Sequence, residues 1–412
     1  MNTQNIAFIM TGYFPLPPVK GGAVENLLYT LIMENEKRKK FNFTVFSNYD
    51  NNAEIQAKQL QYTDIIFIKV PCIVKIIDKI VYWIATYILK KSKNLSYRYI
   101  LQRLWYQYKV AKNLKKNSYN KVIVENTPIS FLALKWFDNL NKYKDRIIYH
   151  LHNEVGKTFG CDTVINNNVT QLIGISSFVN EKFKERFPKF NGSYSILKNC
   201  ITQTKKSKRE NKTADSSLNV REEYNISKNT FLVLFVGRLS KEKGVLEVLS
   251  AFKKVGIKDS HLLIVGGNYY DSDITSSYEK ILKEEAECIK DKVTFTGYID
   301  RELVDLFYKA ANVVVLPSMW DEPAGLTIIE AMNSGTPVVT TISGGIPEYV
   351  GENNVLLIQR NSEIVNSLVS SIQYIYEHEE ESYVMAARAK KIAEEYNPGK
   401  YYQDFQKLIG EI

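Results

Sequence analysis

Short apolar runs alternate with segments of helical period along the whole chain. The runs cover residues 6–10, 43–46, 65–70, 122–124, 147–151 and 172–175 in the first half, and 231–236, 261–265, 293–296, 313–316, 338–340 and 355–358 in the second. Amphipathic stretches such as 24–40, 98–116 and 129–141 separate the runs of the first half. Fully apolar strands that alternate with helices are typical of parallel sheets covered on both faces. The pattern predicts an α/β protein with two doubly wound, Rossmann-like domains.

A polar stretch separates the two series of strands. Residues 202–219 (TQTKKSKRENKTADSSLN) are charged and have no period, so we expect a linker region over 202–229. The N-terminal domain would then cover 1–201 and the C-terminal domain 230–396, and 397–412 would form a short amphipathic helix. A long surface insertion within one domain is the alternative interpretation of the polar stretch.

The composition is that of a folded protein. The 412 residues are 45% apolar and 24% charged, which excludes disordered and collagen-like chains. The four cysteines lie far apart without a C-x-x-C pair, so a disulfide scaffold or zinc ribbon is not expected and a reducing compartment fits. We see no secretory signal, and the most apolar stretch, 73–89, is interrupted by Lys75, Asp78 and Lys79. We therefore expect a cytoplasmic protein.

The charge is unevenly distributed. Residues 1–200 carry 29 Lys and Arg against 14 Asp and Glu, a net charge of +15, whereas residues 201–412 carry 25 against 31, a net charge of −6. Such an asymmetry indicates that the N-terminal half meets an anionic partner. A membrane surface, a phosphorylated ligand and a nucleic acid are the candidates.

Three segments carry residue types suited to phosphate or sugar. The first, 13–28 (YFPLPPVKGGAVENLL), follows a predicted strand and opens a helix. Gly21 and Gly22 let the backbone approach a ligand, and the start of the helix offers free N–H groups and the positive end of its dipole. A glycine turn before an ordinary helix is the alternative.

The second segment, 235–244 (FVGRLSKEKG), follows a strand of the C-terminal domain. The strand ends at Gly237, and Arg238 and Lys243 flank the turn into the next helix. Ligands of open α/β sheets bind at the carboxyl ends of strands, and two cations there suit a diphosphate, with each charge-assisted hydrogen bond contributing about 1.5–3 kcal/mol. A solvated loop with ordinary surface charges is the alternative.

The third segment, 321–332 (DEPAGLTIIEAM), places Glu322 in a loop and Glu330 on the following helix. Carboxylates at these positions can accept hydrogen bonds from sugar or ribose hydroxyls, and Gly325 at the helix start would expose N–H groups to a phosphate. The helix dipole alone also favours acidic residues near a helix start. Glu330, however, lies on an apolar helix, where a carboxylate needs a partner.

Two histidines raise the question of a metal. His150 and His152 alternate at the end of a predicted strand and so point to the same side. An H-x-H pair can supply two metal ligands, but no cysteine or clustered carboxylate completes the set, and the nearby Glu154 is not sufficient. We therefore predict no metal site.

Residues 72–93 (CIVKIIDKIVYWIATYILKKSK) combine isoleucines at helical spacing with a following group of lysines, Lys90, Lys91 and Lys93. This pattern is typical of a helix that lies on an anionic membrane surface. A helix packed on the domain core, with solvated lysines at its end, shows the same pattern. The positive charge of the N-terminal half favours the membrane surface as partner of 73–93.

Together these motifs resemble the retaining GT-B glycosyltransferases of family 4. The second half carries the GR…KEKG segment, the E-x7-E pattern, a GTPVV segment, a second Gly-Gly pair and Glu348. The first half is similar in its GG loop and in the segments YHLHN, IGIS and LKN. Two departures are Ala324, where the family commonly has Phe, and Cys200, which replaces the glycine of the usual Asn-Gly-Val.

The resemblance implies a role for each matched residue. Arg238 and Lys243, next to Gly237, would contact the donor diphosphate, and Glu330 would hold the ribose hydroxyls. The remaining matched residues would surround the transferred sugar and its phosphate: Glu322, the backbone amides of Ala324, Gly325 and Leu326, the loop of Gly21 and Gly22, and His152. Arg238, Lys243, Glu322 and His152 would be the catalytic set.

The resemblance further implies two Rossmann-like domains that face a cleft, with the last helix crossing back to the N-terminal domain. The expected activity is transfer of a hexosyl unit, with retention, from a nucleotide-sugar to a glycan or an undecaprenyl-diphosphate-linked acceptor. A UDP-sugar is the default donor, in bacterial capsular or exopolysaccharide synthesis at the inner face of the membrane. The nucleotide-sugar is a substrate, and neither a cofactor nor a divalent metal is expected.

Two other classes of function compete with this one. The basic runs 37–40 and 205–209 are compatible with a nucleic-acid- or partner-binding protein, although no recognition motif accompanies them and the second half is acidic. We therefore expect no nucleic-acid partner. A nucleotide-sugar-binding protein without catalysis is the other alternative, and the presence of all four charged donor-site residues argues against it.

Overall fold

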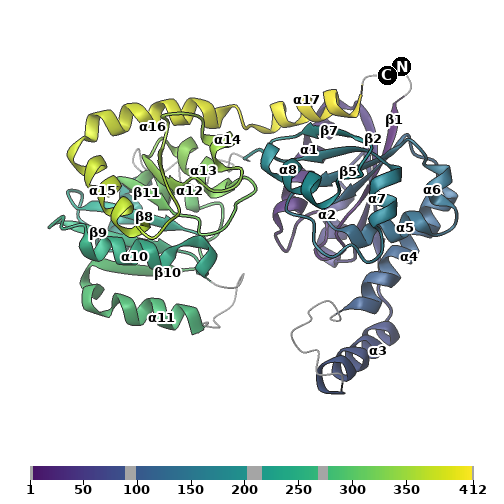
Figure 1. The fold of residues 1–412 in the computed structure, drawn as a ribbon, viewed down its shortest axis with the longest axis horizontal. Coiled ribbons are helices and arrows are strands. Elements are labelled where there is room, and N and C mark those ends of the chain that lie inside the picture. Colours follow the sequence, from purple (N-terminus) through teal and green to yellow (C-terminus); the bar gives the residue numbers. More distant parts are fainter. Residues whose placement is uncertain (1–2, 89–98, 202–215, 268–276, 411–412) are drawn as a thin grey trace. The chain divides into compact units, whose positions relative to one another are not determined.

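The computed structural model describes residues 3–88, 99–201, 216–267 and 277–410. The chain forms two compact units, of which the first consists of residues 1–198 and 398–412 and the second of residues 199–397. Each unit is built around one parallel sheet with helices on its faces (Figure 1). The predicted class, α/β with two Rossmann-like domains, is confirmed.

The first unit contains a seven-stranded sheet in the order β3-β2-β1-β4-β5-β6-β7, and all of its strand pairs are parallel. Its strands are β1 (Gln4–Ile9), β2 (Phe41–Asn48), β3 (Thr63–Ile68), β4 (Lys121–Glu125), β5 (Ile147–Leu151), β6 (Val169–Gly174) and β7 (Ser193–Ile196). Its helices are α1 (Ala23–Arg38), α2 (Asn51–Ala57), α3 (Cys72–Trp83) with the π-helical turn η1 (Ile84–Ile88), α4 (Ile100–Lys116), the 3-10 helix η3 (Pro128–Phe131), α5 (Leu132–Lys135), α6 (Asn139–Lys142), α7 (Asp162–Asn168), α8 (Ser177–Arg186) and α17 (Pro398–Ile409).

The second unit contains a six-stranded parallel sheet in the order β10-β9-β8-β11-β12-β13. Its strands are β8 (Phe231–Val236), β9 (Ser260–Val265), β10 (Val293–Gly297), β11 (Val313–Leu316), β12 (Val338–Thr341) and β13 (Leu356–Ile358). Its helices are α9 (Ser216–Glu223), η4 (Lys241–Lys243), α10 (Val245–Lys254), α11 (Ser277–Ala286), η5 (Glu287–Lys292), α12 (Val304–Ala310), α13 (Leu326–Ser334), α14 (Ile346–Val350), α15 (Ile364–Glu377) and α16 (Glu379–Glu394).

Three details differ from the predicted elements. The first sheet has an additional edge strand, β7, whose sequence SYSI is too short and polar to stand out. The helix predicted over 129–141 is divided into η3, α5 and α6, and positive φ angles of 59° at Phe137 and 62° at Asp138 separate α5 from α6. Within the predicted linker, 202–215 lie outside the described residues, and α9 belongs to the second unit because buried Val220 and Arg221 anchor it there.

The last helix, α17, completes the hydrophobic core of the first unit. It packs along α1, where the hydroxyl of Tyr402 donates a 2.8 Å hydrogen bond to Oδ1 of Asn35. The ring of Phe405 stacks on Phe8 with 6.1 Å between centroids. The chain therefore leaves the first unit after residue 198 and returns to it only at Pro398.

Helix α3 stands off from the first sheet beyond the end of α4 (Figure 1). Its packed face holds Asp78, which is only 2% exposed and accepts hydrogen bonds from the backbone N–H of Leu101 at 3.0 Å and from Nε2 of Gln102 at 2.8 Å. The carboxylate thus caps the first turn of α4.

The opposite face of α3 and η1 is apolar and exposed. Its large side chains are between 37% and 68% exposed: Ile73, Ile76, Ile77, Ile80, Trp83, Ile84 and Tyr87. These residues do not pack in the core, which was one of the two interpretations of the sequence. Among the described residues, no helix is both long and apolar enough to cross a membrane.

Candidate functional site

The order of strands in the second sheet reverses between β8 and β11, and ligands of doubly wound folds bind at such a point, beyond the carboxyl ends of the strands. Gly237 follows β8 directly, and the loop after it lies tightly against the loop after β11. A Cβ on Gly244, whose φ is 73°, would come within 2.0 Å of the carbonyl oxygen of Pro317. The N–H of Met319 also donates a 2.8 Å hydrogen bond to the carbonyl of Glu242. Close backbone packing thus fixes the predicted cationic loop over the end of β11.

This packing brings two of the predicted site residues into contact. The ammonium group of Lys243 donates a hydrogen bond to Oε1 of Glu322, and the hydroxyl of Ser318 donates to the same oxygen at 3.2 Å. The side chain of Glu322 is 10% exposed and that of Lys243 is 22% exposed. The ring of Trp320 lies 5.9 Å from the ammonium nitrogen. A cation and a carboxylate, both partly shielded from water, therefore stand together at the switch point.

Backbone contacts also hold the loop that carries Glu322. Its carbonyl accepts a 2.7 Å hydrogen bond from the N–H of Gly345. The loop continues through buried Ala324 to Gly325, which precedes α13 with a φ of 75° that a residue with a side chain adopts only with strain. Helix α13 begins at the partly exposed Leu326. The first N–H groups of a helix have no partner within it, so this start is suited to an anion.

The other two charged residues predicted for this site are placed differently. Glu330 lies on α13 and pairs with Arg301, with 2.9 Å between its Oε1 and Nη2 of the arginine. No contact between Glu330 and the Lys243–Glu322 pair is found in the described part of the chain. Arg238 is exposed directly after Gly237. The ribose and diphosphate roles of these residues stay predictions.

In the first unit, the predicted glycine loop lies over a buried carboxyl group. Gly21 and Gly22 have φ angles of 74° and 103°, and a Cβ on Gly22 would come within 2.2 Å of Oε2 of Glu25. Glu25 is 3% exposed and accepts a 3.2 Å hydrogen bond from the hydroxyl of Thr11. Burial raises the pKa of Glu25 to about 6. The carboxyl group of Glu25 thus lies at the start of α1, beside the glycine loop that the sequence predicted to approach a phosphate.

A buried triad lies at the ends of β4 and β5. Glu125 and His150 are register partners in these neighbouring strands, and the carboxylate of Glu125 accepts hydrogen bonds from Nδ1 of His150 at 3.2 Å and from Nε2 of His152 at 3.1 Å. Burial acts to raise the pKa of Glu125, but the two imidazoles outweigh it and bring this pKa to about 2. Burial, together with His150, lowers the pKa of His152. The triad therefore contains an ionised carboxylate at neutral pH.

The triad corrects one part of the sequence interpretation. We predicted that no carboxylate completes the two histidines, and this was wrong, because Glu125 lies beside them. The three side chains offer ligand atoms that all lie within 4.8 Å of one another, and an N,N,O donor set is one that divalent metals accept. Nε2 of His152 and Nδ1 of His150 contact Glu125, whereas Nε2 of His150 is buried and has no hydrogen-bond partner among the described residues. That the protein needs no metal stays a prediction.

Sequence reasoning missed Glu25, Glu125 and Ser318 as parts of these clusters. Each of the three residues follows or faces the carboxyl end of a parallel strand. This position was the one feature by which the sequence could have identified them. For Glu125 the signal was a carboxylate directly after the apolar run 122–124.

Comparison with known proteins shows which sequences and folds the chain resembles. Residues 217–392 match the family model of glycosyl transferases group 1. The matched residues all lie in the second unit. The chain is 25% identical over 409 residues to the putative glycosyltransferase YtcC of Bacillus subtilis (strain 168), covering 95% of this chain and 88% of that protein. A second relative is the lipopolysaccharide 1,2-N-acetylglucosaminetransferase of Salmonella typhimurium (strain LT2), 28% identical over 210 residues, which are 50% of this chain and 51% of that enzyme.

The fold is also found among solved structures. Anabaena Alr3699/HepE, crystallised in complex with UDP and glucose, superposes with a TM-score of 0.68 at 18% identity, over 99% of this chain and 100% of that chain. The protein thus has the GT-B fold, which the sequence predicted. At this identity the likeness concerns the fold alone.

Proposed function

We propose that the protein is a retaining, family 4-like hexosyltransferase. It takes a sugar from a nucleotide-sugar, with a UDP-sugar as the default donor, and transfers it to a hydroxyl group of a glycan or lipid-linked glycan. Its product belongs to a cell-surface polysaccharide. The observation that carries the proposal is the contact between Lys243 and Glu322 at the β8–β11 switch point of the unit that matches the family model of glycosyl transferases group 1.

The charges at this point suit a departing nucleoside diphosphate. Negative charge builds up on the diphosphate as its bond to the anomeric carbon breaks, and preorganised cations stabilise that charge. Lys243, Arg238 and the first amides of α13, at Gly325 and Leu326, are the groups that would do so. Since these groups can offset the charge, the proposal requires no divalent metal.

Glu322 would act on the sugar. As an ionised carboxylate it only accepts hydrogen bonds, and at present it accepts them from Lys243 and Ser318. When a diphosphate draws the ammonium group of Lys243 to itself, Glu322 regains acceptor capacity for sugar hydroxyls. The ion pair would thus be replaced by two contacts with the donor, one from Lys243 to the diphosphate and one from Glu322 to the sugar. Glu330 would bind the ribose hydroxyls once its ion pair with Arg301 is broken.

The transfer would take place on one face of the sugar. The bond from the anomeric carbon to the phosphate oxygen breaks, the acceptor oxygen bonds to the same carbon from the same side, and its proton passes to the departing phosphate oxygen. This sequence of bond changes retains the anomeric configuration without an intermediate bound to the protein.

The experiment that tests the donor site is calorimetric titration with UDP, GDP and dTDP in the absence of divalent metal. We expect one of the three to bind and thereby to identify the base. If none binds, the donor site is assigned wrongly.

We also propose that the exposed face of α3 and η1 lies on an anionic membrane. Seven large apolar side chains are exposed there, and Lys79 lies at their border on the same helix. An apolar face with lysines at its border is what an interfacial helix presents to anionic lipid. The predicted lysines Lys90, Lys91 and Lys93 lie outside the described residues. Sedimentation with vesicles of phosphatidylglycerol and phosphatidylcholine tests this contact, and equal binding to both would contradict it.

A further inference from the structure

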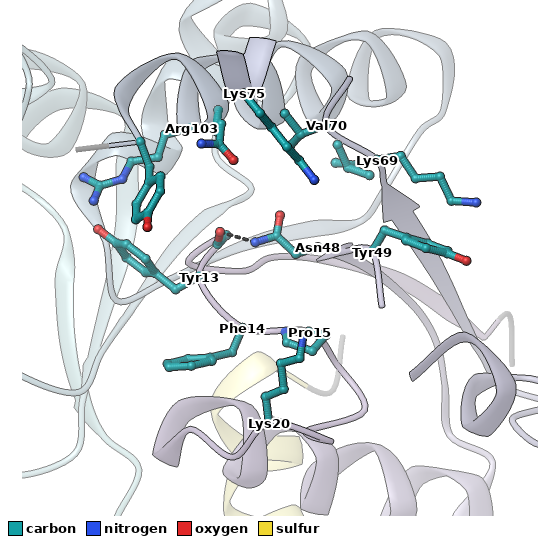
Figure 2. A pocket seen from close by; sticks show the side chains of 14 residues that line it. Tyr13, Phe14, Pro15, Lys20, Asn48, Tyr49, Lys69, Val70, Lys75 and Arg103 are labelled. Carbon is teal, nitrogen blue, oxygen red and sulfur yellow. Dashed lines mark hydrogen bonds between the residues drawn. The ribbon is translucent and has the colours of Figure 1, made fainter. Parts of the chain in front are cut away.

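A pocket of about 610 Å³ opens in the first unit, between the sheet and helices α3 and α4. Its wall is built from the segments that follow three neighbouring strands, β1, β2 and β3, and from the two helices (Figure 2). The lining residues are Gly12, Tyr13, Phe14, Pro15, Lys20, Asn48, Tyr49, Ile68, Lys69, Val70, Lys75, Tyr99, Gln102 and Arg103. The pocket therefore occupies the carboxyl edge of the parallel sheet, where such folds bind ligands.

Cations dominate the lining. Lys20, Lys69, Lys75 and Arg103 contribute four positive charges, and none of the lining residues is acidic. Lys20 is neutralised in part by Asp50 behind it, at 2.8 Å. In the described residues, neither Lys75 nor Arg103 forms an ion pair with a carboxylate. Figure 2 shows Lys75 and Lys20 extending toward the space from opposite sides.

Arg103 is held in place without being neutralised. Its guanidinium group lies over the ring of Tyr13, 4.8 Å from the centroid, and its Nε is buried without a hydrogen-bond partner among the described residues. An unpartnered buried N–H of a cation costs free energy unless an acceptor fills the place. The helix that carries it is fixed to the sheet, since the neighbouring Tyr106 donates a 2.5 Å hydrogen bond to the carbonyl of Phe46.

The pocket and the exposed apolar face lie on different sides of α3. Lys75 lines the pocket from this helix, three residues before Asp78, whose carboxylate faces α4. The exposed isoleucines, such as Ile73 and Ile80, lie on the other side of the helix. A molecule with an anionic head and a long apolar tail could place its head against Lys75 while its tail passes around α3 to the exposed face.

We propose that this pocket binds the diphosphate of a lipid-linked glycan acceptor. The inference rests on the proposed function, which needs an acceptor, and it assigns Lys75 and Arg103 as the main contacts of the diphosphate. Lys20 and Lys69 add charge at the rim. The aromatic rings of Tyr13 and Phe14 offer flat surfaces for the first sugar or the first apolar units. A phospholipid headgroup carries the same phosphate chemistry as a diphosphate ester, so the experiments compare the two ligands.

The test is equilibrium binding of geranyl diphosphate, a short and water-soluble prenyl diphosphate, to the full-length protein. We expect Lys75→Ala and Arg103→Gln each to weaken this binding at least tenfold. Lys116→Ala is the matched control, because Lys116 is an exposed lysine of α4, the helix that carries Arg103, and does not line the pocket, and it should leave the affinity unchanged. Equal losses in all three variants, or no loss in any, would overturn the assignment.

Two further arms separate the possible failures. Vesicles of phosphatidylglycerol test whether the pocket binds a phospholipid headgroup instead. If Lys75→Ala and Arg103→Gln weaken vesicle binding as much as they weaken binding of geranyl diphosphate, the acceptor assignment is overturned. Titration with UDP tests the donor site in the second unit, and we expect unchanged UDP binding in every variant. Failure of the wild-type protein to bind UDP would refute the proposed function, whereas failure to bind geranyl diphosphate with UDP binding intact would refute only this inference.

Discussion

The ammonium group of Lys243 donates a hydrogen bond to the carboxylate of Glu322 across two loops of the second unit. The two residues come from sequence segments 79 positions apart, and each was predicted to contact a different part of the donor. Their pairing offsets one charge with the other. In the proposed function, the donor would have to compete with this contact.

Replacement of Lys243 tests this arrangement. Lys243→Ala should lower kcat by about 100-fold or more, as the loss of one preorganised charge donor does in other active sites. Steady-state transfer assays measure the effect. Lys241→Ala is the control, because Lys241 belongs to the same turn but is exposed. Near-normal turnover of Lys243→Ala would remove this residue from the diphosphate.

The role of Glu330 can be separated from its ion pair. Glu330→Ala should weaken nucleotide binding about tenfold, because hydrogen bonds from the ribose hydroxyls to a carboxylate contribute about 1.5 kcal/mol or more. Arg301→Ala removes the partner and leaves the carboxylate available, so its nucleotide affinity should not fall. Calorimetric titration compares the two variants. Equal losses in both would mean that the ion pair, and not the carboxylate, matters.

The apolar face of α3 makes a prediction about membrane binding. The double variant Ile76→Ser and Ile80→Ser should lose at least tenfold in affinity for anionic vesicles, because each isoleucine that enters the interface contributes about 1 kcal/mol or more. Both side chains are more than half exposed, so the melting temperature should change little. Ile55→Ser is the matched control, since Ile55 is equally exposed on α2 of the same unit. Vesicle binding that is unaffected in the double variant would exclude this face.

Glu25 should make stability depend on pH. Its pKa rises from 4.5 to about 6 on folding, so the folded state binds the proton more tightly than the unfolded chain. The stabilisation is complete below pH 4.5 and is lost as the pH rises through 6, by about 2 kcal/mol in all. Glu25→Gln, which stays neutral, should therefore gain stability relative to the wild type between pH 4.5 and 8. Urea unfolding of both proteins across this range measures the difference, and parallel curves would contradict the prediction.

Removal of metal tests the triad of Glu125, His150 and His152. Dialysis against EDTA should leave UDP binding and turnover unchanged, because the charged groups of the donor site belong to the protein itself. A stoichiometric metal in the purified protein, lost together with activity, would contradict this expectation and would assign the metal to these three side chains. Elemental analysis before and after dialysis gives the answer.

The sequence predicted the sheets well because their strands are buried on both faces. Every residue of β8, for example, is buried, and such a run has few interpretations other than a central parallel strand. The edge strand β7 was missed because its four residues are at least partly exposed. The predicted motifs likewise marked the loops at the strand ends, since glycines and charges interrupt the apolar pattern there.

Contacts between distant segments could not be predicted in this way. Glu125 meets His150 only because β4 and β5 are neighbours in register, and the sequence does not state that register. The ion pair of Glu330 with Arg301 depends on the packing of α12 and its preceding loop against α13. The cationic pocket combines residues from three strand ends and two helices, so no single stretch of sequence contains its pattern.

The return of α17 to the first unit has a consequence for biosynthesis. A ribosome makes Phe8 and Phe41 first, but the rings that cover them, Tyr402 and Phe405, come among the last fifteen residues. Domains that fold during translation usually do so in order from the N-terminus. Here the N-terminal unit cannot finish its core until the second unit has been completely synthesised. A chain cut short at its C-terminus would therefore damage the unit that was made first.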